Sequence, residues 1–173
     1  QSTTELIDAI EMWTSDYSSA LSLYGHINTW DVSQITNMSG LFLNLSSFSD
    51  NISDWDVSSV TNMAQMFAGA EVFNQNISDW DVSNVVNMDR MFFNSDSFDQ
   101  DISTWRVSNV NSMEFIFNPI TNNISNDNKC AIYNSWSEQT SAWVYNWGIF
   151  CPLSSLSLNE IPKVFFLHQN HPN

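Results

Sequence analysis

Residues 73–92 read FNQNISDWDVSNVVNMDRMF, and related stretches recur every 25 residues along the chain. The tetrapeptide Trp-Asp-Val-Ser begins at residues 30, 55 and 80, and Trp-Arg-Val-Ser begins at residue 105. The register holds without a gap from residue 26 to residue 117. A fixed period of this size is typical of chains built from stacked units. Because one such unit is too small to bury its apolar face alone, the core must form between neighbouring units.

Apolar residues recur in columns at this period, and we expect these columns to form the core. The clearest ones are Ile27, Ile52, Ile77 and Ile102; Ile35, Val60, Val85 and Val110; Met38, Met63, Met88 and Met113; Phe42, Phe67, Phe92 and Phe117; and Phe48, Phe73 and Phe98. Between Val57 and Phe67 the steps of three and four favour a helical or 3₁₀ return. Phe73 and Ile77 share parity, which favours a short strand. We therefore predict an α/β repeat solenoid, with one parallel β-strand and one helical return per coil.

The repeated stretch resembles the BspA-type leucine-rich repeat, whose units follow the pattern FNQDISxWDVSxVTNMxxMF. The resemblance extends over residues 26–117, which is more than half of the chain. It implies a leucine-rich-repeat-like fold in an extracellular or cell-surface protein that is used in adhesion and matrix contact. Arg106 and Ser112 depart from the pattern in the last clear unit, so we expect the repeats to degenerate there toward a cap.

Four segments are predicted: a helical N-terminal cap at residues 1–25, four repeats at 26–117, a C-terminal cap at 118–151, and a tail at 152–173. In the first segment, Thr3 or Thr4 can cap a helix. The apolar stripe of that helix is expected at Leu6, Ile7, Ile10 and Trp13. In the third segment, the Asn-rich stretch that includes Asn126 and Asn128 is expected to be a loop.

Cys130 and Cys151 are the only two cysteines and lie 21 positions apart. This spacing suits one disulfide that closes a local loop and staples the C-terminal cap. The alternative is a pair of buried free thiols. A disulfide favours a secreted protein. The chain begins at Gln1 without a leader, so we expect a mature product whose signal peptide has been removed.

Acidic residues outnumber basic ones by nineteen to four, which gives a formal net charge of −15. This charge repels phosphate backbones and anionic lipid, so nucleic acid and membrane surfaces are poor partner classes. A cation or a basic protein is a better one. Five acidic residues recur in register, and calcium bridging and simple solvent screening both remain open as accounts of them: Asp31, Asp56 and Asp81 in one column, and Asp54 and Asp79 in another.

The sequence contains neither a catalytic motif nor a cofactor-binding motif, and we expect no enzymatic activity. Five N-x-Ser sequons are present, at Asn37, Asn44, Asn51, Asn76 and Asn123. Asn37 shares a column with Asn62 and Asn87, which we expect to hydrogen-bond the backbone of adjacent coils. Asn37 is therefore expected to be buried, and N-glycans are predicted at the other four sequons.

An apolar run lies near the end of the chain and consists of Val164, Phe165, Phe166 and Leu167. Such a run needs a surface to bury against, either on its own domain or on a neighbouring subunit. Burial on a neighbour would join copies of the chain head to tail. The sequence thus predicts an extracellular structural subunit that assembles with copies of itself into a filament, tube or coat. The alternative is a cell-surface module that binds a glycan or another protein in adhesion.

Overall fold

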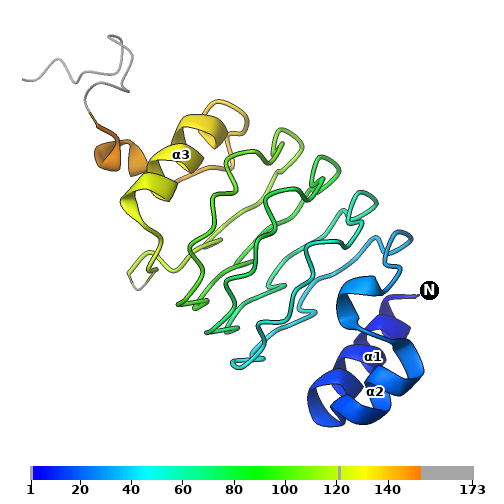
Figure 1. Cartoon of the computed structure of the whole chain (residues 1–173). Helices are drawn as coiled ribbons and strands as arrows, with labels where there is room; N and C mark the ends of the chain where they lie inside the picture. Colours follow the sequence, from blue (N-terminus) through cyan, green and yellow to red (C-terminus); the bar gives the residue numbers. More distant parts are fainter. Residues whose placement is uncertain (1, 121, 153–173) are drawn as a thin grey trace, which may run out of the picture.

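The computed structural model describes residues 2–120 and 122–152. Figure 1 shows a row of coils with helices at both of its ends. The α-helices are α1 (Thr3–Ser15), α2 (Tyr17–Tyr24) and α3 (Asn126–Trp136), and two short 3₁₀ helices are η1 (Ile27–Thr29) and η2 (Trp147–Phe150).

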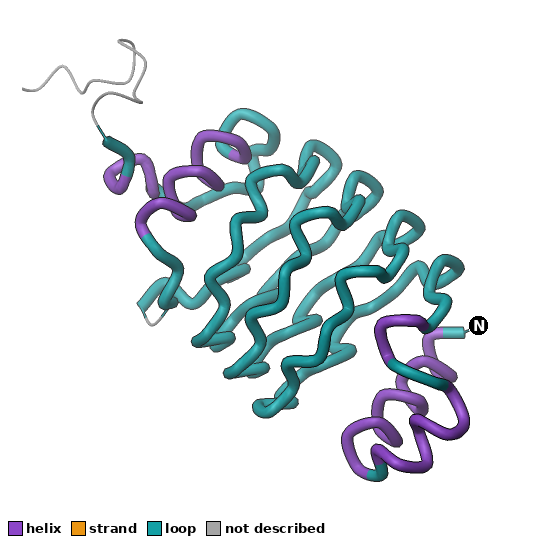
Figure 2. The backbone as a smooth tube through the Cα atoms, viewed as in Figure 1, coloured by secondary structure: helices purple, strands orange, loops and turns teal. Residues whose placement is uncertain are grey.

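The coils contain turns and irregular chain in place of the predicted strands. No β-strand occurs in residues 2–120 or 122–152, so the prediction of an α/β, leucine-rich-repeat-like solenoid is wrong. Figure 2 shows the coils as loop throughout. The helical return predicted between Val57 and Phe67 is replaced by turns. The β-type pairing in this part of the chain consists of isolated parallel bridges, which join Asn37 to Asn62, Asn62 to Asn87, Asn87 to Ser112, and Phe92 to Phe117.

Left-handed residues explain why no strand forms. In the second coil, Gln65 and Gly69 have φ angles of 58° and 73°. Their counterparts in the other coils also have positive φ, namely Gly40, Arg90 and Phe115 in one column and Asn44 and Asn94 in the other. A strand needs consecutive residues in the extended region of backbone space. The left-handed residues interrupt any extended run at the same two points of the first three coils and at one point of the fourth.

From residue 38 to residue 44, and in the matching parts of the next two coils, backbone N–H groups alternate between two kinds of partner. The Phe42 N–H donates to the Met66 carbonyl of the next coil at 2.8 Å, whereas the Leu43 N–H donates to the Gly40 carbonyl of its own coil at 3.0 Å. We call the bonds that run from an N–H in one coil to a carbonyl in the next coil the ladder. Its donors are Met38, Gly40, Phe42 and Asn44; Met63, Gln65, Phe67 and Gly69; and Met88, Arg90 and Phe92. Because every second donor turns back on its own coil, this pairing differs from that of a β-sheet.

On the segment where a strand was predicted, side-chain amides join the coils. Gln75 Nε2 donates to the Ser49 carbonyl at 2.7 Å, and Gln100 Nε2 donates to the Asn74 carbonyl at 3.1 Å. These bonds replace a backbone ladder, so the polar residues between Phe73 and Ile77 have a structural role.

Two stacks of phenylalanine rings run through the centre of the coils. In the first stack, Phe42, Phe67, Phe92 and Phe117 have ring centroids 5.3, 5.6 and 5.7 Å apart and planes within 10° of parallel. In the second stack, Phe73 lies 4.1 Å from Phe67 of its own coil. Each of these side chains is fully buried, which contributes roughly 1.5–3 kcal/mol per ring. The apolar columns of the sequence are therefore the core.

The Trp-Asp-Val-Ser motif ties each coil to the one before it. The indole Nε1 atoms donate to isoleucine carbonyls of the preceding coil, Trp55 to Ile27 at 2.8 Å, Trp80 to Ile52 at 3.3 Å and Trp105 to Ile77 at 3.0 Å. The aspartate fixes the turn that follows. The Asp56 carboxylate accepts from the Ser58 N–H at 3.1 Å and from its hydroxyl at 2.6 Å.

The N-terminal cap contains two helices, where the sequence predicted one. Ser2, and not Thr3 or Thr4, caps α1: its hydroxyl accepts from the Glu5 N–H at 3.3 Å, and the Glu5 carboxylate accepts from the Ser2 N–H at 2.7 Å. The buried face consists of Leu6, Ala9, Ile10 and Trp13. Ile7, which was expected on this face, is 37% exposed.

At the other end, α3 begins at Asn126, so the stretch predicted as a loop provides the first turn of a helix. Cys130 in α3 forms the predicted disulfide with Cys151, which directly follows η2. The Trp136 ring stacks on Trp105 of the last coil, with centroids 6.1 Å apart and planes 14° apart. The disulfide-linked segment thus covers the C-terminal end of the core.

Candidate functional site

Two hollows of about 560 Å³ each mark the described surface. The first, which we call the N-terminal cavity, lies between α1, the end of α2 and the first coil. The second, which we call the transverse groove, crosses all four coils. Each hollow combines charged side chains with apolar or aromatic ones, so these two are our candidate sites on the described surface.

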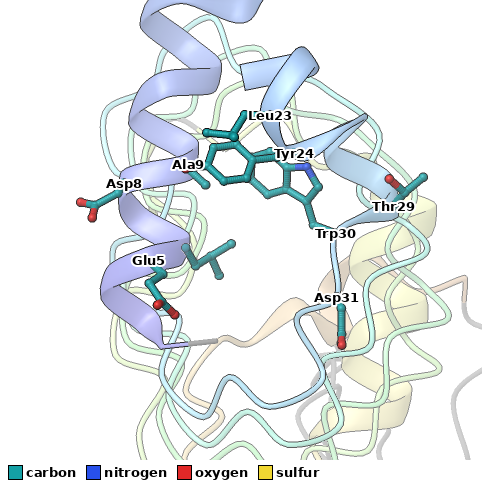
Figure 3. Close-up of a pocket in the computed structure, with 9 residues that line it drawn as sticks. Glu5, Asp8, Ala9, Leu23, Tyr24, Thr29, Trp30 and Asp31 are labelled. Carbon is teal, nitrogen blue, oxygen red and sulfur yellow. The ribbon is translucent and has the colours of Figure 1, made fainter. Parts of the chain in front are cut away.

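The N-terminal cavity combines aromatic rings with carboxylates. Figure 3 shows Glu5 and Asp31 on opposite sides of the hollow and the rings of Tyr24 and Trp30 together at one end. The two rings meet edge to face with centroids 5.8 Å apart. Tyr24 is 41% exposed, whereas Trp30 is 9% exposed. Asp8 from α1 also lines this cavity.

Hydrogen bonds hold two of these carboxylates in the ionised form. The backbone N–H of Ser2 and then its hydroxyl lower the pKa of Glu5. The hydroxyl of Ser33 and then its N–H lower the pKa of Asp31, at 2.7 and 3.1 Å. Since charge-assisted bonds to N–H and O–H groups favour the charged state, both side chains are anionic at neutral pH.

The cavity exists because Trp30 is the first tryptophan of its column. Trp55, Trp80 and Trp105 each meet a carbonyl of a preceding coil, but no coil precedes Trp30, whose Nε1 donates to Gly25 within its own segment at 3.3 Å. The sequence did not predict this site. The position of Trp30 at the start of the repeats is the feature of the sequence that could have predicted the cavity.

The transverse groove has exposed apolar side chains and one cation. Leu43 in the first coil and Phe115 in the fourth are each 40% exposed. The Arg90 guanidinium lies over the Phe115 ring, 5.8 Å from its centroid. Because Gly69 lines the groove between them with no side chain, the centre of the groove stays open.

The predicted calcium columns have structural partners. Asp31, Asp56 and Asp81 each accept a hydrogen bond from the serine two residues ahead. In the part of the chain that the structure describes, no three His, Cys, Asp or Glu side chains are grouped so that they could hold a metal ion. Calcium binding by Asp54, Asp79 and the three turn aspartates therefore stays a prediction.

Asparagines that were predicted to bond adjacent coils bond their own coil. The side-chain oxygens of Asn37, Asn62 and Asn87 accept the N–H groups two residues ahead, at 2.9–3.0 Å. Asn37 is exposed, so the expectation that it is buried was wrong. A column of local turns needs no burial, which explains the difference.

The four sequons predicted to carry glycans are all exposed. At Asn51 and Asn76 the side-chain oxygen accepts a serine N–H, at 2.9 and 3.0 Å, and Nδ2, the atom that carries an N-glycan, has no partner within the described residues. At Asn123, Nδ2 donates to the Asp96 carbonyl at 2.8 Å. Asn44 has a left-handed backbone. Glycosylation at the four positions stays a prediction, which the geometry favours most at Asn51 and Asn76.

The apolar run from Val164 to Leu167, predicted to contact a neighbouring subunit, lies outside the described residues. Among residues 2–120 and 122–152, no helix has the length and apolar character needed to cross a membrane.

Comparison with known proteins gives one family. No curated protein and no solved structure matches the chain significantly. A family described as "Mycoplasma protein of unknown function, DUF285" matches residues 10–129, more than half of the chain, from within α1 into α3. Trp-Asp-Val-Ser motifs, phenylalanine stacks and the transverse groove all fall inside the matched region. The chain therefore belongs to the DUF285 family.

Proposed function

We propose that this chain is a non-enzymatic extracellular module that binds a glycan or another protein through the side of its coil stack. The observation that carries this proposal is that both ends of the stack are covered by the chain itself. A covered stack presents its lateral surface, and not its ends, to other molecules.

At the N-terminal end, α1 lies along the first coil and is attached to it at two points. The Thr3 hydroxyl donates to the Asn37 carbonyl at 3.1 Å, and Trp13 Nε1 donates to the Asp50 carboxylate at 2.9 Å. The Asn37 carbonyl is the position at which a preceding coil would join the ladder. Thr3 therefore occupies a bonding site that a second copy would need for continuous stacking.

At the C-terminal end, residues that follow α3 take the same role. The Tyr145 hydroxyl donates to the Phe117 carbonyl at 2.6 Å and accepts the Phe117 N–H at 3.2 Å. The Thr140 hydroxyl donates to the Val110 carbonyl at 2.7 Å. Side chains thus pair with backbone groups of the last coil, which favours a closed module over an open-ended stack.

The lateral surface offers the transverse groove. Exposed apolar side chains at Leu43 and Phe115, with Arg90 beside them, are of the kind that other molecules contact. The disulfide and the four exposed sequons support an oxidising, extracellular setting. The resemblance to BspA-type surface proteins supports adhesion as the purpose of the contact.

Light scattering and a binding screen test this proposal together. We expect a monomer that binds a member of a glycan and matrix-protein panel with saturation. The double variant Leu43→Ser, Phe115→Ser is expected to weaken that binding at least about tenfold, since each side chain that anchors an interface costs more than about 1 kcal/mol when it is truncated. Val144→Ser is the matched control, because Val144 is 71% exposed at the C-terminal cap. Equal affinity of the two variants would contradict the proposal.

Self-assembly into a filament, tube or coat is the second candidate, and the apolar run at Val164–Leu167 favours it. Electron micrographs of the full-length chain and of its Phe165→Ser, Phe166→Ser variant distinguish the two candidates. Ordered polymers that the variant fails to form would establish assembly. Identical monomeric particles from both would leave the binding module as the function.

A further inference from the structure

We propose that the N-terminal cavity binds an organic cation, namely a guanidinium or alkylammonium group carried by a small molecule or by an Arg or Lys side chain. This site is separate from the transverse groove, and the proposal holds whether or not the groove binds a ligand.

Negative charge is the first reason. Glu5, Asp8 and Asp31 line the cavity, although Figure 3 shows the Asp8 carboxylate directed away from the hollow. No Lys or Arg of the described residues lines the cavity with them. Glu5 accepts a hydrogen bond from the Ser2 N–H, and Asp31 accepts bonds from the N–H and the hydroxyl of Ser33; none of these donors carries a full charge. A cation entering the cavity would thus meet carboxylates that no described Lys or Arg side chain neutralises.

The aromatic end of the cavity is the second reason. Tyr24 and Trp30 place two electron-rich rings beside the carboxylates, and such rings attract cations by their quadrupoles. Leu23, which is 65% exposed, adds an apolar edge suited to an alkyl chain. Carboxylate, ring face and aliphatic edge together match a group that is charged at its end and apolar along its stem.

The spacing of the carboxylates argues for an organic cation over a metal ion. A calcium ion needs several oxygen ligands at about 2.3–2.6 Å. Figure 3 shows Glu5 and Asp31 separated by the width of the hollow. No metal-holding group of acidic side chains occurs within the described part of the chain. A cavity of about 560 Å³ instead admits a guanidinium or alkylammonium group with its stem.

The repeat shows that this cavity is specific to the first coil. Asp56 occupies the position of Asp31 one coil later and makes the same two bonds to its serine, at 3.1 and 2.6 Å. Asp56, however, lies beside Trp55, whose indole is bonded to the preceding coil at 2.8 Å, and it does not line the cavity. Asp31 and Asp56 are therefore a natural matched pair for mutagenesis.

The test is a titration of the full-length chain with Nα-acetyl-arginine amide, followed by the NMR signal of the Trp30 indole N–H. We expect a saturable shift of this signal. Nα-acetyl-citrulline amide, which is similar in shape but uncharged, should produce no saturable shift. An equal response to the two compounds would overturn the proposal, as would the absence of any response to the arginine compound.

Variants locate the site. Asp31→Asn should weaken the binding of the arginine compound about two- to fivefold, the range of a partly exposed ion pair. Asp56→Asn should leave that binding unchanged. Tyr24→Leu should weaken it by a similar factor of about two to five. Unchanged signals from the other tryptophans verify that each variant is folded. Equal effects of Asp31→Asn and Asp56→Asn would mean that only the net charge matters and would refute the site.

Two further titrations identify the source of the cation. A short Gly/Ser peptide with one central arginine should bind more tightly than the arginine compound if a protein side chain is the ligand, and equally if the ligand is a small molecule. Calcium chloride, at matched ionic strength, should not shift the Trp30 signal. A saturable calcium shift abolished by Asp31→Asn would overturn the assignment to an organic cation.

Discussion

The two ends of the stack are closed in different ways. At the C-terminal end, Trp136 continues the tryptophan column, since its ring lies nearly parallel to Trp105. At the N-terminal end, Trp13 meets Trp30 edge to face, with centroids 5.7 Å apart and planes 86° apart. The parallel ring closes the core, whereas the edge-on ring leaves the N-terminal cavity beside it. A cap that continues a repeated column therefore seals a repeat, and one that packs across it creates a site.

The largest test of this contrast replaces the two tryptophans that face the caps. Trp136 is fully buried, so Trp136→Ala should lower the free energy of unfolding by about 4 kcal/mol. Trp30→Ala should lower it by only about 2 kcal/mol, because one side of Trp30 already faces the cavity. Urea unfolding measures both, and equal losses would contradict the contrast. Trp136→Phe is the control, since it keeps a ring and removes an Nε1 that has no hydrogen-bond partner.

The disulfide provides the next test, because it is confined to the C-terminal cap. Replacing Cys130 and Cys151 with serine should destabilise the chain by about 3 kcal/mol, the value expected for a loop of this length. A reducing agent should lower the stability of the wild type by a similar amount and leave the variant unchanged. If the reducing agent has no effect on the wild type, the cap does not depend on the disulfide.

The N-terminal cap depends on its helix cap. Ser2→Ala should cost about 1 kcal/mol by removing the hydroxyl that accepts the Glu5 N–H. Thr4→Ala should change the stability by less than about 0.5 kcal/mol, since Thr4 is exposed. Thermal unfolding compares the two variants. A larger effect at Thr4 would show that the helix begins where the sequence first suggested.

Acid should destabilise the N-terminal cap of the stack, and alkali should destabilise its C-terminal cap. Hydrogen bonds to Ser2 and Ser19 lower the pKa values of Glu5 and Asp16 from 4.5 and 3.8. The two carboxylates therefore add to the free energy of unfolding above those values, and this contribution is lost as the pH falls through the folded pKa values. Burial raises the pKa of Tyr145 above 10.0. Tyr145 therefore adds to the free energy of unfolding below pH 10.0, and this contribution is lost as the pH rises through the raised pKa. Hydrogen exchange should show α1 opening first in acid and the Tyr145 segment opening first in alkali.

The sequence predicted the core better than the secondary structure. The period and the buried columns follow from burial alone, so the isoleucine, methionine and phenylalanine positions were identified. Steps of three and four between Val57 and Phe67 suggested a helix, but tandem turns give the same spacing. Gly69 and Asn44 are residue types that favour a left-handed backbone, so the sequence indicated their conformation. Gln65 and Phe115 gave no such indication, because the coil-to-coil ladder holds them there against their own preference.

The candidate site was harder to find than the core for a physical reason. Periodicity identifies what every coil shares, whereas the N-terminal cavity arises where the repeat stops. The sequence singled out neither Glu5 nor Tyr24 as a site residue. Their approach to Trp30 depends on the angle between α1 and α2, which local sequence patterns do not encode.

The bonds of the ladder run from an N–H in the earlier coil to a carbonyl in the later one. A second set of inter-coil bonds runs the opposite way: the N–H groups of Thr61, Val86 and Asn111 donate to carbonyls of the earlier coil. The peptide dipoles of the two sets therefore oppose one another along the stack, as strand dipoles do in a β-sheet and unlike those of an α-helix. A charged surface would thus act on this molecule chiefly through its side-chain charges, whose formal sum is −15.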